Sequence, residues 1–197
     1  MTAAMSHFTL LAWGAWCILC VVWTSGYVAD RRAGVPARLT PHLGLQVAAS
    51  VLLFFAFALL LLRPNLRGLA AAVTPQNALL GTLGALLAVA GVAWAIWARL
   101  MLGLNWSGLV MQVKERHELV QTGPYAIVRH PIYTGILAAV LGTALTLGKL
   151  ASYLAVAAAL VALLTRVEIE ERMMAAEFGE AHAAYRRRTR KLIPFVW

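Results

Sequence analysis

Acidic residues are scarce in this 197-residue chain, which has eight Asp and Glu against 17 Lys and Arg, and only 13% of its residues are charged. Hydrophobic residues make up 61% of it, well above the roughly 45–50% of soluble domains. A net charge of +9 could indicate nucleic-acid binding, but the basic residues stand between long apolar runs. That pattern is typical of membrane-protein loops, so we predict one compact membrane domain and no nucleic-acid partner.

Several short motifs are also missing. Cys17 and Cys20 form a CxxC pair, but no second pair or nearby histidine accompanies them, which favours helix packing over redox or metal chemistry. No HxxxH or HExxH spacing is present, so we expect no metal site. The lack of a GxGxxG or P-loop motif counts against a soluble nucleotide-binding fold.

Long apolar runs predict an all-α integral membrane protein with about five transmembrane helices and a C-terminal cytoplasmic amphipathic helix. Gly81, Gly84 and Gly91 in the third run are expected to allow close helix approach. The last two runs are short and are separated by Gly148 and Lys149, which favours a tight helical hairpin, with a re-entrant pair as the alternative. The runs cover residues 8–28, 43–62, 77–98, 133–147 and 150–165.

The basic residues also predict the orientation. With five spans, all Lys and Arg except Arg63, Arg67 and Lys149 fall on one side. The positive-inside rule then places the N-terminus outside and the C-terminus in the cytoplasm, and we expect a bacterial inner membrane. The long polar stretch at residues 99–131 and the tail after residue 165 would share the cytoplasmic side, where they could build one site.

The stretch HELVQTGPYAIVRHPIY, residues 117–133, gathers rings, charges, prolines and a glycine just before an apolar run. Polar side chains held at the membrane boundary are costly and so indicate function. Tyr125 and Tyr133 offer ring faces to a bound cation, and His117 and His130 offer hydrogen bonds or a flat ring for stacking.

A second set of charges directly follows the last apolar run. Arg166 and Glu170 are four residues apart and share one helical face at the membrane boundary. Glu170 and Glu171 could attract a cation, while Arg166 could hold an anionic group with two hydrogen bonds. A neighbouring face continues along the tail, and the basic residues 186–191 suit anionic lipid. That face comprises Val167, Glu171, Met174, Phe178, His182 and Tyr185.

Four blocks carry a family resemblance: LGLNWSG (102–108), the 117–133 stretch, RVEIEE (166–171) and EFGEAHAAYRRRTRKLIP (177–194). In this order and spacing they resemble the isoprenylcysteine carboxyl methyltransferases, relatives of the membrane phospholipid methyltransferases. The resemblance covers residues 99–194. It implies that residues 99–197 form a methyltransferase core with a cofactor loop, a helical hairpin and a C-terminal helix. Residues 1–98 would supply the first three transmembrane helices of the same structural unit.

The resemblance also implies S-adenosylmethionine as cofactor, with Arg166 binding the substrate and Arg166 and Glu170 acting in catalysis. His182 stands where the family often has tyrosine, and Val110 replaces a glutamine, although Gln112 is close. The cofactor contacts of the family correspond to His117, Glu118, Leu119, Val120, Tyr125, His130, Pro131, Ile132, Tyr133 and Glu170.

The expected reaction is methyl transfer to a membrane lipid or a prenylated small molecule or protein that enters sideways from the bilayer. A carboxylate acceptor is already ionised and needs no base, whereas an amine acceptor would need one, and Glu171 or His130 would be the candidates. The alternatives are phospholipid or amine N-methylation, an NAD(P)H-dependent isoprenoid or sterol reductase sharing the RHPxY piece, and a non-catalytic scaffold.

Overall fold

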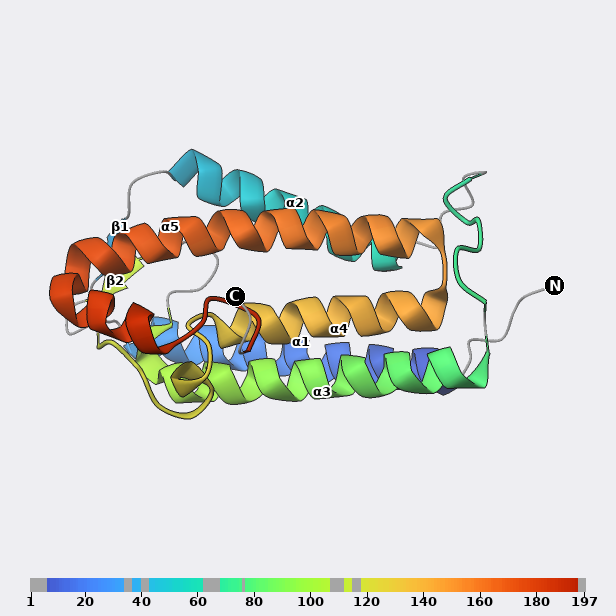
Figure 1. Ribbon diagram of the computed structural model, residues 1–197, viewed down its shortest axis with the longest axis horizontal. Coiled ribbons are helices and arrows are strands. Elements are labelled where there is room, and N and C mark those ends of the chain that lie inside the picture. Colours follow the sequence, from blue (N-terminus) through green and yellow to red (C-terminus); the bar gives the residue numbers. More distant parts are fainter. Residues whose placement is uncertain are drawn as a thin grey trace.

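A computed structural model describes residues 7–33, 37–39, 43–61, 68–75, 77–106, 112–114 and 118–194. Its main helices run along one long axis (Figure 1) and are α1 (His7–Ala33), α2 (Leu43–Leu61), α3 (Ala78–Leu102), α4 (Pro131–Leu147) and α5 (Leu150–Arg188). By length and composition α1, α2, α3 and α5 could each cross a membrane, and α4 is a shorter apolar helix of 17 residues. The predicted all-α membrane fold is confirmed, while the number of crossings stays a prediction.

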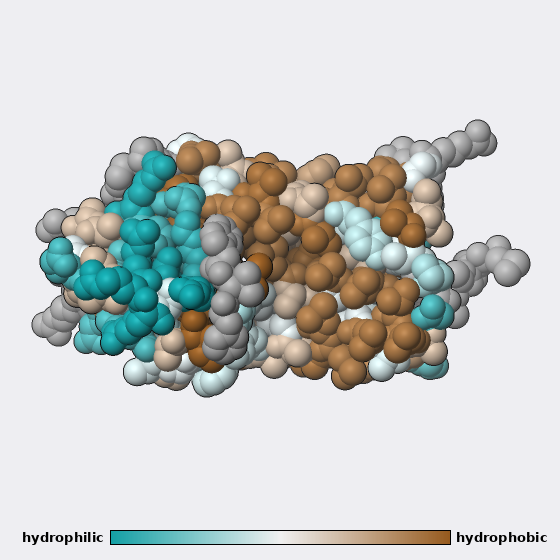
Figure 2. Space-filling model, viewed as in Figure 1, coloured by the Kyte–Doolittle hydropathy of each residue, from teal (hydrophilic) through white to brown (hydrophobic). Residues whose placement is uncertain are grey.

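The outer surface of these helices is apolar. Only 22% to 44% of the residues in the apolar windows of α1, α2, α3 and α5 are buried inside the protein. Large side chains such as Val21, Phe54 and Leu86 are exposed. In Figure 2 the hydrophobic surface covers most of the long axis, and the hydrophilic residues gather at one end. An apolar belt of this extent suits lipid rather than water.

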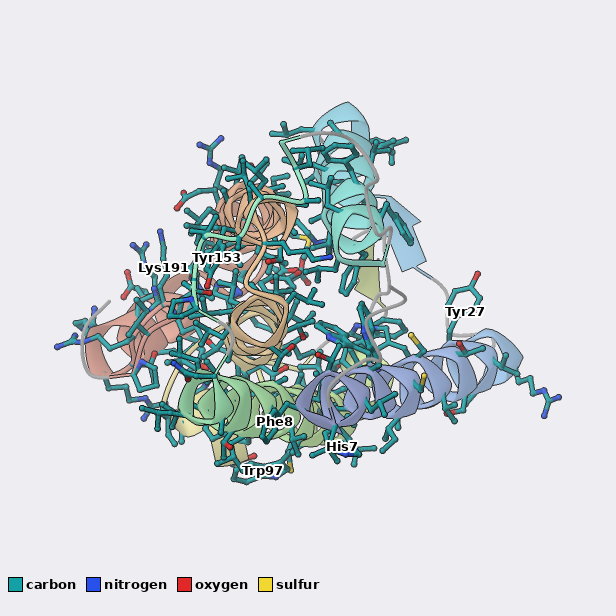
Figure 3. The ribbon with its side chains drawn as sticks, turned by 90° about the vertical axis from the view of Figure 1, so that its right-hand side faces the viewer. His7, Phe8, Tyr27, Trp97, Tyr153 and Lys191 are labelled. Carbon is teal, nitrogen blue, oxygen red and sulfur yellow. The ribbon has the colours of Figure 1, made fainter. Side chains whose placement is uncertain are left out.

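Seen along its axis, the bundle places α4 between the α1–α3 pair and the α2–α5 pair (Figure 3). The indole Nε1 of Trp16 in α1 donates a hydrogen bond to Thr143 Oγ1 in α4 at 2.9 Å. Phe8 lies between α1 and α3, where its ring fills the space beside Gly81. α2 packs on α5, so the first two helices stand on opposite sides of α4.

The α3–α4 contact depends on residues without side chains. A Cβ atom on Gly91 would lie 2.6 Å from Gly135 O and 2.6 Å from Ala139 N, and one on Gly84 would lie 2.7 Å from Gly142 O. These backbones can therefore approach only because glycine occupies the contact. The predicted role in close helix approach is confirmed for Gly84 and Gly91, and Gly81 makes room for the Phe8 ring of α1.

α4 and α5 form the predicted hairpin. Gly148 turns the chain with φ 63°, and Leu150 N donates to Ala71 O at 2.9 Å, which ties the turn to the preceding loop. A positive φ suits glycine because it has no Cβ to clash with the backbone. α4 and α5 therefore run antiparallel over the length of α4.

Two features differ from the expected organisation. The C-terminal helix is not a separate element, because α5 continues without a break from the apolar residues to a kink at Gly179, where φ is 46°. A short antiparallel ribbon also joins β1 (Ala37–Leu39) to β2 (Gln112–Lys114), in a region expected to be loop. The ribbon ties the first loop to the long polar stretch.

Candidate functional site

The loop before α4 is shaped by its own sequence. Gly123 has φ 60°, and Pro124 and Tyr125 are buried in the short 3-10 helix η2 (Gly123–Ala126). α4 then begins at Pro131, a favoured residue at the first helical position because its missing N–H would have no partner there. His130 is thereby fixed at the N-cap of α4, with 6% of its side chain exposed.

The C-terminal tail holds this loop in place. The backbone N–H groups of Arg129 and His130 donate to Arg190 O at 2.8 Å and Lys191 O at 3.1 Å. Thr134 Oγ1 donates to Leu192 O at 2.6 Å. The Tyr185 hydroxyl donates to Tyr125 O at 2.6 Å. The expected meeting of the polar stretch with the tail is confirmed by these bonds.

His130 stands between two carboxylates. Its Nδ1 is 3.0 Å from Glu170 Oε2, and its Nε2 is 2.8 Å from Glu171 Oε1. An ionised carboxylate only accepts hydrogen bonds, so both ring nitrogens can donate at once only when the ring is protonated. Burial alone would lower the pKa of His130, but its hydrogen bonds to Glu170 and Glu171 outweigh this and raise the pKa above its ordinary value.

Glu171 is surrounded by basic side chains from two segments, the loop before α4 and the helix end after Gly179. Arg129 Nε donates to its Oε1 at 2.8 Å, while Arg186 Nε and His182 Nε2 lie 3.4 Å and 4.0 Å from its Oε2. Glu171 lies beyond the apolar part of α5. Burial would raise its pKa, but the hydrogen bonds from His130 and Arg129 hold the pKa at about 2. Glu171 is therefore ionised. Its Oε1 joins α5 to the loop through two hydrogen bonds, and its Oε2 faces Arg186 in the helix end after Gly179.

Tyr133 links the two residues that were predicted to act together on α5. Its hydroxyl donates a short hydrogen bond to Glu170 Oε1 and accepts one from Arg166 Nε at 3.2 Å. The rings of His130 and Tyr133 are parallel to within 3°, with centroids 5.9 Å apart. Arg166 is 5% exposed, whereas the Glu170 side chain is 22% exposed and so remains reachable. We refer to this group of side chains as the polar cluster: Arg129, His130, Tyr133, Arg166, Glu170 and Glu171.

A hollow of about 580 Å³ lies beside the polar cluster, on the side of Arg129. Apart from Ala183 and Thr189, the residues lining it are basic: Arg129, Arg186, Arg187, Arg190 and Lys191. Such a lining suits an anionic group. A cationic ligand would instead be attracted to Glu170, the partly exposed carboxylate of the cluster.

The predicted site residues that the structure describes fall into three groups. His130, Tyr133, Arg166 and Glu170 come together in the polar cluster. Tyr125 is buried in the adjoining core, and Pro131 and Ile132 form the buried first turn of α4. His117 lies outside the described residues. The remaining three, Glu118, Leu119 and Val120, lie beside η1 (Gly103–Asn105), where the backbone N–H of Glu118 donates to Asn105 Oδ1 at 3.0 Å.

Sequence reasoning missed two members of this region. Arg129 was grouped only with the loop, although it pairs with Glu171 and donates through Nη1 to Thr189 O at 2.8 Å. Ser50 in α2 accepts a hydrogen bond from Arg166 Nη1 at 3.0 Å. The available signal for Ser50 is its position four residues after Gln46, the other polar side chain of an otherwise apolar helix.

Comparisons with known proteins find a matching family model and several similar proteins. A family model described as phospholipid methyltransferase matches residues 79–181. The chain is 33% identical over 101 residues to the protein-S-isoprenylcysteine O-methyltransferase of Schizosaccharomyces pombe, covering 50% of this chain and 43% of that protein. It is 33% identical over 127 residues to the cobalt-zinc-cadmium resistance protein CzcN of Cupriavidus metallidurans, covering 62% of this chain and 51% of that protein.

A solved structure is similar as well. The eukaryotic intramembrane Ras methyltransferase, an isoprenylcysteine carboxyl methyltransferase, superposes with a TM-score of 0.54 and 25% identity, covering 80% of this chain and 55% of that one. The chain thus spans about half the length of the relatives that it matches. The resemblance to isoprenylcysteine carboxyl methyltransferases that the four sequence blocks predicted is confirmed by these similarities.

Proposed function

Because the chain belongs to the phospholipid methyltransferase family, matched over residues 79–181, we propose that it is an S-adenosylmethionine-dependent methyltransferase. Its acceptor is a carboxylate on a prenylcysteine-type or other lipid-like molecule. One observation carries the proposal. A cationic side chain, Arg166, and an anionic one, Glu170, contact the same hydroxyl of Tyr133. Groups that suit an anionic acceptor and a cationic donor therefore stand next to each other.

The chemistry of this cluster fits the cofactor. S-adenosylmethionine, when bound, supplies a methyl group already activated on a sulfonium. Glu170 attracts the positive charge, and the neutral ring of Tyr133 offers its face to it. The protonated His130 holds Glu170 in place through Nδ1, because its Nε2 is anchored to Glu171. The chain's main task is then to align donor and acceptor and to exclude water.

Arg166 is the group that holds the acceptor. A guanidinium presents five N–H donors, so the contacts with Tyr133 and Ser50 are compatible with a further contact to a carboxylate. We propose that the acceptor enters from the bilayer, because Arg166 directly follows the apolar part of α5. Residues 99–197 would carry the chemistry, supported by the helices of residues 1–98.

The cluster favours a carboxylate acceptor over an amine. An amine must lose a proton to attack, and the candidate bases were Glu171 and His130. Glu171 has a pKa of about 2 and binds Arg129, so it is a poor base. His130, with its raised pKa and two carboxylate partners, is held in its protonated form. A carboxylate acceptor requires neither group to accept a proton.

The decisive experiment is incubation of detergent-purified protein with methyl-labelled S-adenosylmethionine and a panel of acceptors. We expect label on N-acetyl-S-farnesylcysteine, in a form that base releases as methanol, because a methyl ester is base-labile. Stable label on phosphatidylethanolamine would establish N-methylation instead. Binding of NADPH in place of S-adenosylhomocysteine would favour the reductase alternative, which the family match already disfavours.

We also propose that the N-terminus lies outside the membrane and the C-terminus in the cytoplasm. The proposal rests on the distribution of Lys and Arg, which leaves only Arg63, Arg67 and Lys149 on the outer side. A reporter fused after Trp197 should read as cytoplasmic, and one inserted near Asn65 should read as external. Two reporters on the same side would refute the five-span topology.

A further inference from the structure

α2 is almost entirely apolar, and its two polar side chains lie on one face. Gln46 and Ser50 are four residues apart, and the rest of Leu43–Leu61 is hydrophobic or glycine. Gln46 is fully buried and Ser50 is half-buried. A polar residue in a membrane helix is costly unless it serves a purpose, so this pair marks a specific contact rather than general packing.

Ser50 makes that contact with Arg166. Its hydroxyl donates to Gln46 O in the preceding turn at 2.8 Å and lies 3.0 Å from Arg166 Nη1. A hydroxyl has one proton, and that proton is committed to Gln46 O. A guanidinium can only donate, so the Ser50 oxygen accepts from Arg166 without competition. The backbone of α2 thereby orients the Ser50 lone pair, and Ser50 orients Nη1.

The guanidinium is then held from two directions. Tyr133 in α4 fixes Nε at 3.2 Å, and Ser50 in α2 fixes Nη1 at 3.0 Å. An arginine side chain carries about 2 kcal/mol of rotamer entropy, and two anchors on separate helices remove much of this freedom before a ligand arrives. A preorganised guanidinium binds a carboxylate more tightly and in a defined direction.

We infer that Ser50 is a positioning residue that orients Arg166 toward the acceptor carboxylate, and that α2 thereby forms part of the acceptor side of the site. This inference rests on the proposed function, since it requires Arg166 to hold the acceptor. It extends the site beyond residues 79–181, the part of the chain that the family model matches. α2 thus contributes to specificity as well as to spanning the membrane.

A purely structural role for Ser50 makes a different prediction. Serine often donates to the carbonyl four residues back simply to satisfy its hydroxyl in a helix. If Ser50 only seated α2 on α5, its loss would affect every acceptor ligand equally. If it positions Arg166, its loss should affect only ligands with a negative charge for Arg166 to hold.

The test compares a charged carboxylate with its neutral methyl ester, which differs from it only by the added methyl group. Calorimetry in detergent, with S-adenosylhomocysteine present, measures binding of N-acetyl-S-farnesylcysteine and of its methyl ester. The variants are Ser50→Ala, which suits a helix well, and Ser50→Thr, which keeps the hydroxyl. Ser25→Ala is the matched control, because the Ser25 hydroxyl also bonds its own helix, at Val22 O, on an exposed part of α1.

Ser50→Ala should bind the carboxylate roughly 3- to 10-fold more weakly, the net contribution of one typical hydrogen bond, and should bind the ester as the wild type does. Its KM for the carboxylate should rise while its affinity for S-adenosylhomocysteine stays unchanged. Ser50→Thr should restore most of the loss, and Ser25→Ala should match the wild type.

Equal losses for carboxylate and ester, or no loss for either, would overturn the positioning role and leave the proposed function standing. Wild-type protein that binds S-adenosylhomocysteine but not the carboxylate would overturn the inference together with the acceptor assignment. Wild-type protein that binds neither ligand would instead refute the proposed function itself, and the inference would fall with it.

Discussion

The backbones of α3 and α4 touch at glycine residues, whereas around His130 the helices are joined through charged side chains. At Gly91 there is no room for one more carbon atom. In the polar cluster the carboxylates of Glu170 and Glu171 accept hydrogen bonds from Tyr133, His130 and Arg129. The first region should therefore be damaged by added atoms, and the second by lost atoms or charges. Lipid surrounds the first, so close packing has to replace the hydrophobic effect there.

Gly91→Val should have the largest effect. Its side chain would meet the backbone of Gly135 and Ala139 at 2.6 Å, and backbone cannot move aside as a flexible side chain can. We expect a loss of about 3 kcal/mol or more in stability, at the upper end for overpacking, seen as low yield and a lowered melting temperature in detergent. Gly14→Val is the control, because nothing lies within 4 Å of a Cβ at Gly14. Equal melting temperatures for the two variants would refute the close-contact argument.

Glu171→Gln should have the second largest effect on stability, because it removes a buried charge while keeping the size of the side chain. Arg129 and His130 would lose their shared carboxylate while staying buried, which typically costs about 3 kcal/mol. The matched change is Glu168→Gln, whose partner is Lys191 and whose side chain is 54% exposed. An exposed pair contributes roughly 0–1 kcal/mol, so thermal melts should separate the two variants clearly. Indistinguishable melts would mean that Glu171 does not hold the tail to α5.

Arg166→Ala tests whether one member of the polar cluster serves substrate rather than structure. Methyl transfer to the carboxylate should fall roughly 30- to 1000-fold, about 2–4 kcal/mol for a lost charge-assisted contact. Affinity for S-adenosylhomocysteine should stay nearly intact. Arg166→Lys should recover only part of the rate, because an ammonium lacks the planar fork.

The comparison for Arg166→Ala is Glu170→Ala, which should weaken cofactor binding. Matching losses of cofactor affinity and melting temperature in the two variants would assign Arg166 to the structural part of the cluster and remove it from the acceptor site.

pH should have the smallest effect, and only the polar cluster should show it. The pKa of His130 is raised, so the stability from its protonated ring is complete below its ordinary pKa of about 6.5 and is lost as pH rises through the raised value. The pKa of Glu171 is lowered to about 2, so its contribution is complete above the ordinary value of 4.5 and is lost as pH falls toward 2. The melting temperature should therefore be highest between these limits.

His130→Gln should flatten the alkaline side of this melting profile, whereas Gly14→Val should leave the profile unchanged. A wild-type profile whose alkaline side matches that of His130→Gln would argue against a protonated His130.

The sequence predicted the membrane helices well because hydropathy and length are local properties. The helical period also predicted the face of α5 at Val167, His182 and Tyr185, which is buried. What this face covers was not predicted, because only the tertiary structure brings the Tyr185 hydroxyl to Tyr125 O in the loop before α4. The β1–β2 ribbon joins segments more than seventy positions apart, and two three-residue strands leave almost no local pattern.

The sequence likewise predicted some residues of the site and not others. His130, Tyr133, Arg166 and Glu170 stood out because polar residues near an apolar run are costly and because they carry the family resemblance. Ser50 did not, since a single serine in an apolar helix is usually satisfied by its own backbone. Its role depends on which helix packs against α2, and that helix begins a hundred residues later in the sequence.

The bonds between the tail and the loop also determine when during synthesis the site can form. Arg129 donates through Nη1 to Thr189 O, 60 positions further along the chain. The backbone N–H groups of Arg129 and His130 find their acceptors only when Arg190 and Lys191 have been synthesised. α1 to α4 can enter the membrane and pack before those residues exist, but the loop before α4 cannot yet adopt its final shape. A nascent chain stalled before residue 189 should therefore be membrane-inserted and unable to bind ligand. The site can therefore form only after the residues from Thr189 onward have been synthesised and have bonded to the loop.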